Sequence, residues 1–222
     1  MKIYIIGAGK MGKSIHALMQ ENGLDVRLIH HTELHSTENN LTVDADFIIE
    51  TIIEDLEAKK KLFTELEKIC PLKCVFTSNT SSLPLDAISH SHRFLGMHFF
   101  NPPTVMKLVE VERTVYTSRE AEQQAWDLAM RLSKRPIQKR IVNPILFTML
   151  DKACEMFLQQ DKGGSTGNHI TFETIDLAFR LGLNHKLGPF ELMGFIGFDT
   201  CEAIFKQFQL KYGVRFIKMF KW

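Results

Sequence analysis

A glycine-rich turn close to the start of the chain constrains the fold more than any other feature. The run Gly7-Ala8-Gly9-Lys10-Met11-Gly12 follows an apolar stretch at 2–6 and opens an amphipathic helix that ends at Asn22-Gly23. A G-x-G-x-x-G pattern is weak evidence alone, but between a strand and a helix it is typical of dinucleotide-binding folds. The three glycines permit, in order, a tight turn, close approach of a pyrophosphate, and close packing of helix on sheet.

Beyond this turn, short apolar strands alternate with amphipathic helices. Strands are expected at 26–29, 46–49 and 75–77, and helices at 56–69 and 118–132. This alternation predicts a mostly parallel sheet with helices on both faces. From residue 140 the pattern is helical only, with helices at 145–160, at 171–181, from 189, and at 200–211. We therefore expect an α/β fold, with a Rossmann-type dinucleotide-binding domain over residues 1–139 and a smaller all-helical domain over residues 140–222.

The turn predicts where the pyrophosphate of a dinucleotide would bind. Gly7, Gly9 and Gly12 shape the loop, and Lys10 and Met11 begin the helix that follows. The helix N-terminus offers amide donors and a partial positive charge to phosphate groups. A purely structural turn is the alternative.

The residue after the second strand bears on the choice of cofactor. His30 stands where NAD-binding proteins place an acidic residue for the adenosine ribose. His30 can bond a ribose hydroxyl, Glu33 follows three residues later, and no arginine follows to hold the 2′-phosphate of NADP. We expect NAD, with NADP not excluded. A solvated loop is the alternative for both side chains.

A histidine and a glutamate flank one turn in the segment His98-Phe-Phe-Asn-Pro-Pro-Thr-Val-Met-Lys-Leu-Val-Glu110. Both lie six residues from Thr104, the last residue of the turn-forming run 101–104. In an antiparallel hairpin centred there, the two side chains face each other. A carboxylate beside an imidazole fixes its tautomer and stabilises its charged form. The pair therefore predicts a base that takes a hydroxyl proton.

Several ordered motifs carry a resemblance to a known family. They are the opening glycines, Ser78-Asn79-Thr80-Ser81-Ser82-Leu83, His98-Phe-Phe-Asn101-Pro102, Met106-Lys-Leu-Val-Glu110, Ile141-Val142-Asn143 and Leu187-Gly188-Pro189-Phe190-Glu191-Leu192. Over residues 1 to about 205 the chain resembles the L-3-hydroxyacyl-CoA dehydrogenases, called 3-hydroxybutyryl-CoA dehydrogenases in bacteria. The resemblance implies oxidation of an (S)-3-hydroxyacyl-CoA to the 3-oxo thioester, with hydride passing to NAD, and a place in fatty acid metabolism.

The resemblance also implies roles in catalysis. His98 would be the general base and Glu110 its partner, while Ser81 and Asn143 would contact the reacting oxygens of the substrate. Simpler readings stay open for two of these residues. Ser81 is also a good turn former, and Asn143 is a good helix cap because Pro144 follows it.

Three further residues are implied as cofactor contacts, in addition to Ser81. Glu54, Lys59 and Asn101 match family positions that lie along the dinucleotide. A solvated start of the helix at 56–69 is the alternative for the first two.

The chain departs from the family in two places that bear on function. Only about fifteen residues separate the second strand from Asp46, where the family has a helical insertion that helps hold coenzyme A. The stretch 136–143 also lacks the glycine-containing loop that the family places before the asparagine. Two alternatives therefore remain: a dehydrogenase of a smaller 3-hydroxy acid that carries no CoA, and a dinucleotide-binding protein without turnover.

Composition limits the partners and the compartment. Lys plus Arg number 27 and Asp plus Glu 26, so no charge excess favours nucleic acid or an anionic membrane. Cys70 and Cys74 have no second ligand pair nearby, so we expect no metal site. Free thiols and a chain that begins directly with a strand suit the cytoplasm. The strongly apolar helices after residue 140 favour a homodimer.

Overall fold

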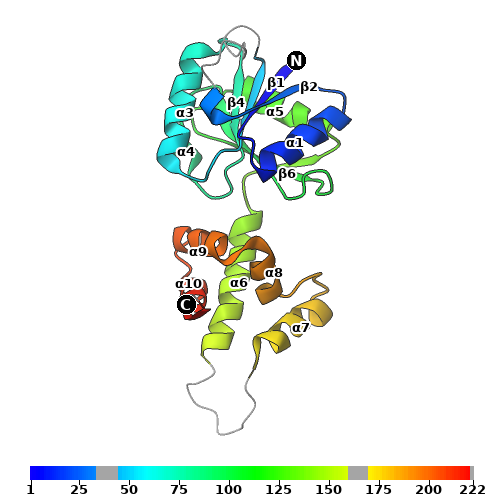
Figure 1. Ribbon diagram of the computed structural model, residues 1–222, viewed down its shortest axis with the longest axis vertical. Helices are drawn as coiled ribbons and strands as arrows, with labels where there is room; N and C mark the ends of the chain where they lie inside the picture. The colour runs from blue at the N-terminus through cyan, green and yellow to red at the C-terminus, as the bar shows by residue number, and fades with distance from the viewer. Residues whose placement is uncertain (34–44, 160–169, 221–222) are drawn as a thin grey trace. The chain divides into compact units, whose positions relative to one another are not determined.

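The chain forms two compact units in the computed structural model, which describes residues 1–33, 45–159 and 170–220. The units are Met1–Arg140, a sheet with helices, and Ile141–Trp222, which is helical where it is described (Figure 1). The predicted fold class, a Rossmann-type α/β part followed by a helical part, is confirmed. The independence of the two parts as domains stays a prediction.

A seven-stranded sheet forms the first unit. Its strands are β1 (Lys2–Ile6), β2 (Asp25–Ile29), β3 (Phe47–Glu50), β4 (Val75–Ser78), β5 (Phe94–Phe99), β6 (Leu108–Arg113) and β7 (Arg135–Gln138). They lie in the order β2-β1-β3-β4-β5-β6-β7, and all neighbours are parallel except β5 and β6. The carboxyl ends of β1, β3, β4 and β5 therefore meet at one edge, where α/β proteins bind their ligands.

The last strand, β7, was not predicted from the sequence. It carries Pro136 and has no fully buried residue, so it lacks the apolar run that marks a central strand. A proline is tolerated there because β7 is an edge strand.

Helices cover both faces of the sheet. They are α1 (Lys10–Glu21), α3 (Leu56–Ile69), α4 (Leu85–Ile88) and α5 (Arg119–Arg131), with a short 3-10 helix, η1 (His31–Glu33). Figure 1 shows α1 and α5 on one face and α3 and α4 on the other. Successive side chains of β1 point to opposite faces of the sheet. Ile3 and Ile5 pack in the core that contains α1 and α5, whereas Tyr4 and Ile6 pack in the core that contains α3.

The glycine turn between β1 and α1 has the predicted tight geometry. Gly7 has φ +118°, a value that L side chains rarely adopt. A β-carbon on Gly12 would lie 1.8 Å from the carbonyl oxygen of Gly7. Thr51 closes the turn from the end of β3, because its hydroxyl donates to Gly7 O at 2.9 Å.

The second unit contains α6 (Val142–Leu158), α7 (Phe172–Gly182), α8 (Pro189–Ile196), α9 (Phe198–Gln207) and α10 (Lys211–Phe220). Its core brings together Phe147, Met193 and Phe205 from α6, α8 and α9. None of the helices in the described stretches has the length and apolar character that crossing a membrane requires.

Two predictions about these helices were wrong. The helix expected at 200–211 is α9, but it ends at Gln207, because a turn containing Gln209, with φ +57°, follows it. Lys211 instead begins α10, which was not predicted. The cap expected at Asn143 is absent: α6 begins at Val142, Ile141 is the N-cap, and Asn143 lies in the first turn. The apolar pair Ile141-Val142 gave no sign of a helix start.

The motif 187–192 has a packing role at the start of α8. A β-carbon on Gly188 would lie 2.3 Å from the Cα atom of Asp176. The Asp176 carboxylate accepts hydrogen bonds from the amides of Phe190 and Glu191, at 2.8 and 3.1 Å, and so satisfies two of the first amides of the helix.

We predict that Gly12→Ala destabilises the protein by about 3 kcal/mol, because the new methyl group collides with backbone that cannot move away without opening the turn. Gly9→Ala is the matched control, since a β-carbon there meets nothing within 4 Å; its cost should stay below about 1 kcal/mol. Urea unfolding of both variants measures the difference. Equal losses would contradict the packing argument.

Candidate functional site

Three side chains form a hydrogen-bonded series at the carboxyl edge of the sheet. His98 and Glu110 pair across β5 and β6 in the predicted register. His98 Nδ1 lies 2.8 Å from Glu110 Oε2, and His98 Nε2 lies 3.0 Å from Ser81 Oγ. The sequence predicted the first contact; the second joins a residue from the loop after β4 to the pair.

The arrangement fixes the tautomer of the imidazole. Glu110 is fully buried, and an ionised carboxylate can only accept, so Nδ1 of His98 carries a hydrogen. Nε2 of the neutral ring is then an acceptor, and the Ser81 hydroxyl donates to it. An imidazole whose Nε2 accepts from a hydroxyl, and whose Nδ1 is paired with a carboxylate, is suited to removing a proton from an alcohol.

The hairpin that carries the pair is held at its tip. Lys134, the residue before β7, donates from Nζ to the carbonyl oxygens of Pro103 and Met106, at 2.5 and 3.0 Å. Asn79, just after β4, accepts the amide of Phe99 at 2.8 Å and fixes the end of β5. These contacts limit movement of the hairpin segment that follows His98.

The serine turn, defined here as Thr80–Leu83, is gathered around one carboxylate oxygen. Glu54 Oε1 accepts from Thr80 Oγ1 at 2.6 Å, from the amides of Ser81 and Ser82 at 3.0 and 3.1 Å, and from Ser82 Oγ at 3.0 Å. Glu54, expected along the cofactor, therefore also holds Ser81 in place.

A buried ion pair connects Glu54 to the sheet. Lys59 Nζ lies 2.5 Å from Glu50 Oε1 and 3.4 Å from Glu54 Oε2. Glu50, at the end of β3, also accepts from Ser78 Oγ at 2.6 Å. Burial raises the pKa of Glu54, but the Lys59 charge and the hydrogen bonds from Thr80 and Ser82 outweigh it and hold this pKa below its usual value. Glu54 is therefore an anion at neutral pH.

The start of α1 fits the pyrophosphate of a dinucleotide. In the described structure no side chain caps this helix and its first turn contains no acidic residue, so neither competes with a phosphate for the first amides of the helix, at Lys10 and Met11. A β-carbon on Gly9 would meet no atom within 4 Å, which leaves room for a phosphate against the backbone.

His30 and Glu33 lie together at the tip of β2. Glu33 Oε2 accepts the backbone amide of His30 at 3.2 Å, and His30 Nδ1 lies 2.7 Å from Thr32 Oγ1. A carboxylate is thus present where an acidic ribose ligand is expected, although it comes from η1 rather than from the residue that ends the strand.

The other two predicted site residues come from the hairpin turn and from the second unit. Asn101 is exposed in the hairpin turn that follows β5. Asn143 belongs to the second unit, half-buried in the first turn of α6. Their predicted contacts with cofactor and substrate stay predictions.

Sequence reasoning did not single out four residues that shape the site: Thr51, Asn79, Lys134 and Arg140. Each bonds a backbone group far away in the chain. Backbone partners leave no pattern in a sequence. For Asn79 alone a signal existed, because it belongs to the motif 78–83.

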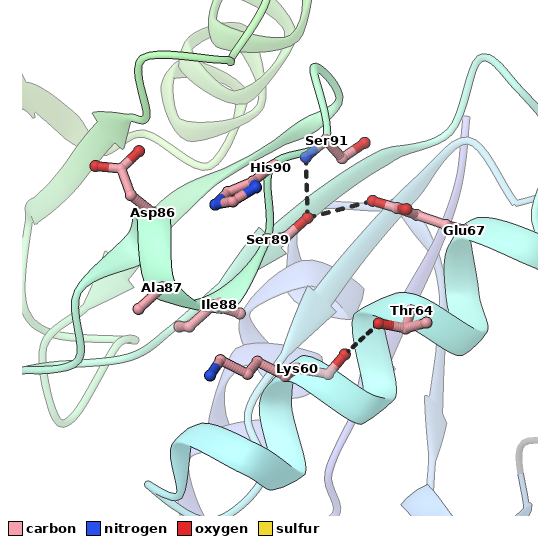
Figure 2. Close-up of a pocket in the computed structure, with 9 residues that line it drawn as sticks. All are labelled: Lys60, Thr64, Glu67, Asp86, Ala87, Ile88, Ser89, His90 and Ser91. Atoms are coloured by element: carbon pink, nitrogen blue, oxygen red, sulfur yellow. Dashed lines mark hydrogen bonds between the residues drawn. The ribbon is translucent and has the colours of Figure 1, made fainter.

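A separate hollow of about 420 Å³ lies between α3 and the segment from α4 to β5 (Figure 2). In Figure 2 the hydroxyl of Ser89 bridges Glu67 and the amide of Ser91, at 3.2 and 3.1 Å. None of the predicted catalytic or cofactor residues lines it.

Comparison with known proteins agrees with the geometry. Residues 30–141 match the NAD binding domain of 3-hydroxyacyl-CoA dehydrogenase, and residues 141–222 match its C-terminal domain. The chain is 30% identical to a 3-hydroxybutyryl-CoA dehydrogenase of Clostridioides difficile, over 96% of this chain and 89% of that one. It is 37% identical to a mitochondrial hydroxyacyl-coenzyme A dehydrogenase of Homo sapiens, over 72% of this chain and 51% of that one.

Among solved structures, an (S)-3-hydroxybutyryl-CoA dehydrogenase from Ralstonia eutropha is similar, with a TM-score of 0.79 and 26% identity over 97% of this chain and 89% of that one. The match to the NAD binding domain assigns NAD as cofactor. Since both family models match and together span residues 30–222, the chain belongs to the 3-hydroxyacyl-CoA dehydrogenase family.

Proposed function

We propose that the protein interconverts an (S)-3-hydroxyacyl-CoA and the 3-oxoacyl-CoA, with His98 as the general base. The hydrogen-bonded series from Ser81 through His98 to Glu110 is the observation that supports this most directly. Family membership supports the reaction class. In oxidation, C3 of the substrate loses a hydride and its hydroxyl loses a proton; NAD, when bound, accepts the hydride.

His98 performs the proton half of this reaction. Nε2 takes the proton of the C3 hydroxyl, and the imidazolium that forms lies 2.8 Å from the Glu110 carboxylate, which stabilises its charge. In the reverse direction the same Nε2 returns the proton to the oxygen on C3. Ser81, beside Nε2, orients that oxygen, and Asn143 contributes a second polar contact to the substrate.

A serine–histidine–carboxylate series also occurs in hydrolases, where the serine is a nucleophile. That chemistry requires amide groups that can stabilise an oxyanion. Here the amides of Ser81 and Ser82 donate to Glu54, and the amide of Leu83 donates to Thr80 Oγ1. These contacts favour proton transfer from a substrate hydroxyl over acyl transfer to Ser81.

The substrate is proposed to be a CoA thioester, in line with the names of the relatives. The family is expected to have its coenzyme A insertion between the second strand and Asp46, where this chain has only a short connection. Residues 34–44 of this connection lie outside the described residues. The alternative is a dehydrogenase of a smaller 3-hydroxy acid that carries no CoA. Measuring kcat/KM for the reduction of acetoacetyl-CoA and of free acetoacetate distinguishes the two. The alternative requires the higher kcat/KM for free acetoacetate.

We propose a cytoplasmic homodimer that acts in fatty acid metabolism. The four cysteines are free thiols, which suits a reducing compartment. The second unit exposes large apolar side chains, among them Leu181, Leu183 and Phe195. Light scattering over a range of concentrations tests the dimer.

We predict that His98→Gln lowers kcat for the reduction of acetoacetyl-CoA by NADH by about 10²- to 10⁴-fold, since general acid–base catalysis contributes that much. The absorbance of the reduced nicotinamide reports the rate. His90→Gln, an exposed histidine in the hollow of Figure 2, is the matched control and should retain full activity. Wild-type protein that binds NADH but turns over neither acetoacetyl-CoA nor acetoacetate would instead support the non-catalytic binding protein.

We also predict that NADH supports a higher kcat/KM than NADPH. Glu33→Ala should lower the ratio of kcat/KM with NADH to kcat/KM with NADPH. A carboxylate at the tip of β2 repels the 2′-phosphate, and two unit charges 4 Å apart in water interact by about 1 kcal/mol, or about fivefold in affinity. Steady-state kinetics with both cofactors measures the ratio. An unchanged ratio would place Glu33 outside cofactor recognition.

A further inference from the structure

The serine turn is held from two sides. Glu54 binds its amide and hydroxyl groups, as described above. On the other side, Arg140 binds its carbonyl groups: Nη1 donates to Leu83 O at 2.9 Å and, at a longer 3.5 Å, to Thr80 O. The Glu54 carboxylate therefore accepts hydrogen bonds from amides and hydroxyls of the turn, and the Arg140 guanidinium donates to two of its carbonyl groups.

The Arg140 guanidinium is itself fixed by β6. Its Nε lies 2.5 Å from Glu112 Oε2, and the two side chains are only 14% and 27% exposed. Charge-assisted hydrogen bonds of this kind are about twice as strong as neutral ones. The planar guanidinium, held through Nε, directs Nη1 to the carbonyl of Leu83.

The strand that orients Arg140 also orients the base. Glu110 and Glu112 are two residues apart on β6, so their side chains point to the same face of the sheet. Glu110 binds His98, and Glu112 binds Arg140. One strand thus fixes both partners of the Ser81–His98 contact, the imidazole directly and the serine through Arg140.

We propose that Arg140 is a positioning residue that keeps Ser81 Oγ within hydrogen-bonding distance of His98 Nε2. Its consequence for turnover rests on the function proposed above, but its consequence for the Ser81–His98 hydrogen bond does not. Removing the guanidinium leaves the carbonyl side of the turn without its charged donor, so Ser81 spends less time against the imidazole.

The test uses Arg140→Met, which keeps the aliphatic stem, in full-length protein labelled with ¹⁵N-histidine. The Nε2 resonance of His98 is assigned by its loss in His98→Gln. Ser81→Ala sets the shift that accompanies complete loss of the hydrogen bond. Arg140→Met should move the resonance in the same direction by a smaller amount, and should move it no further in the Ser81→Ala background.

Two variants accompany it. Arg113→Met removes a β6 arginine whose ion pair with Glu122 is long, at 3.8 Å, and should leave the resonance in place. Glu112→Gln keeps an oxygen acceptor but removes the charge, and should give a shift between those of the wild type and Arg140→Met. If Arg140→Met fails to fold, the shift of the His98 Nε2 resonance in Glu112→Gln tests the proposal in its place.

An unmoved resonance in Arg140→Met, or an equal movement with and without Ser81, would overturn the proposal. Where the wild type turns over acetoacetyl-CoA, Arg140→Met should lower kcat by about 10- to 100-fold, as expected for a misplaced contact, with KM for NADH unchanged. A wild type without turnover refutes the proposed function only, because the resonance still reports on Arg140.

Discussion

The hydrogen bond between His98 and Glu110 is the interaction on which the rest of the site depends. Moving a carboxylate fully out of water costs several kcal/mol unless polar partners offset it, and Glu110 is fully buried. The hairpin supplies the partner through its register, because a slip of one residue between β5 and β6 would put Glu110 and His98 on opposite faces of the sheet. Lys134 and Asn79, which bind the tip of the hairpin and the end of β5, therefore help to keep the pair in register.

A second charged network holds the serine turn in place. It begins at Glu50, at the end of β3, passes through the buried ammonium of Lys59 and ends at Glu54, around which the serine turn is wrapped. Removing one partner from a buried ion pair typically costs about 3–5 kcal/mol, because the other charge is left uncompensated. Ser81 is therefore positioned by the sheet through a series of charges, although it belongs to a loop.

The sequence was informative where neighbours in the chain determine geometry. The symmetry of the segment 98–110 about Thr104 was enough to predict its pairing register, and the glycine spacing was enough to predict the turn before α1. It was not informative where a side chain meets distant backbone. Nothing near Arg140 indicates that its partner is the carbonyl of Leu83, 57 residues away. Local rules also misplaced the start of α6, because Asn143-Pro144 has the composition of a cap without being one.

These observations connect the stretch 136–143 to the serine turn. β7 pairs in parallel with β6 as far as Val111, and the amide of Lys139 donates to Val111 O at 3.2 Å. The next residue, Arg140, then binds Glu112, the next residue along β6. The residue after β7 thus places a cation against the serine turn, and β6 orients both Arg140 and His98 through Glu112 and Glu110.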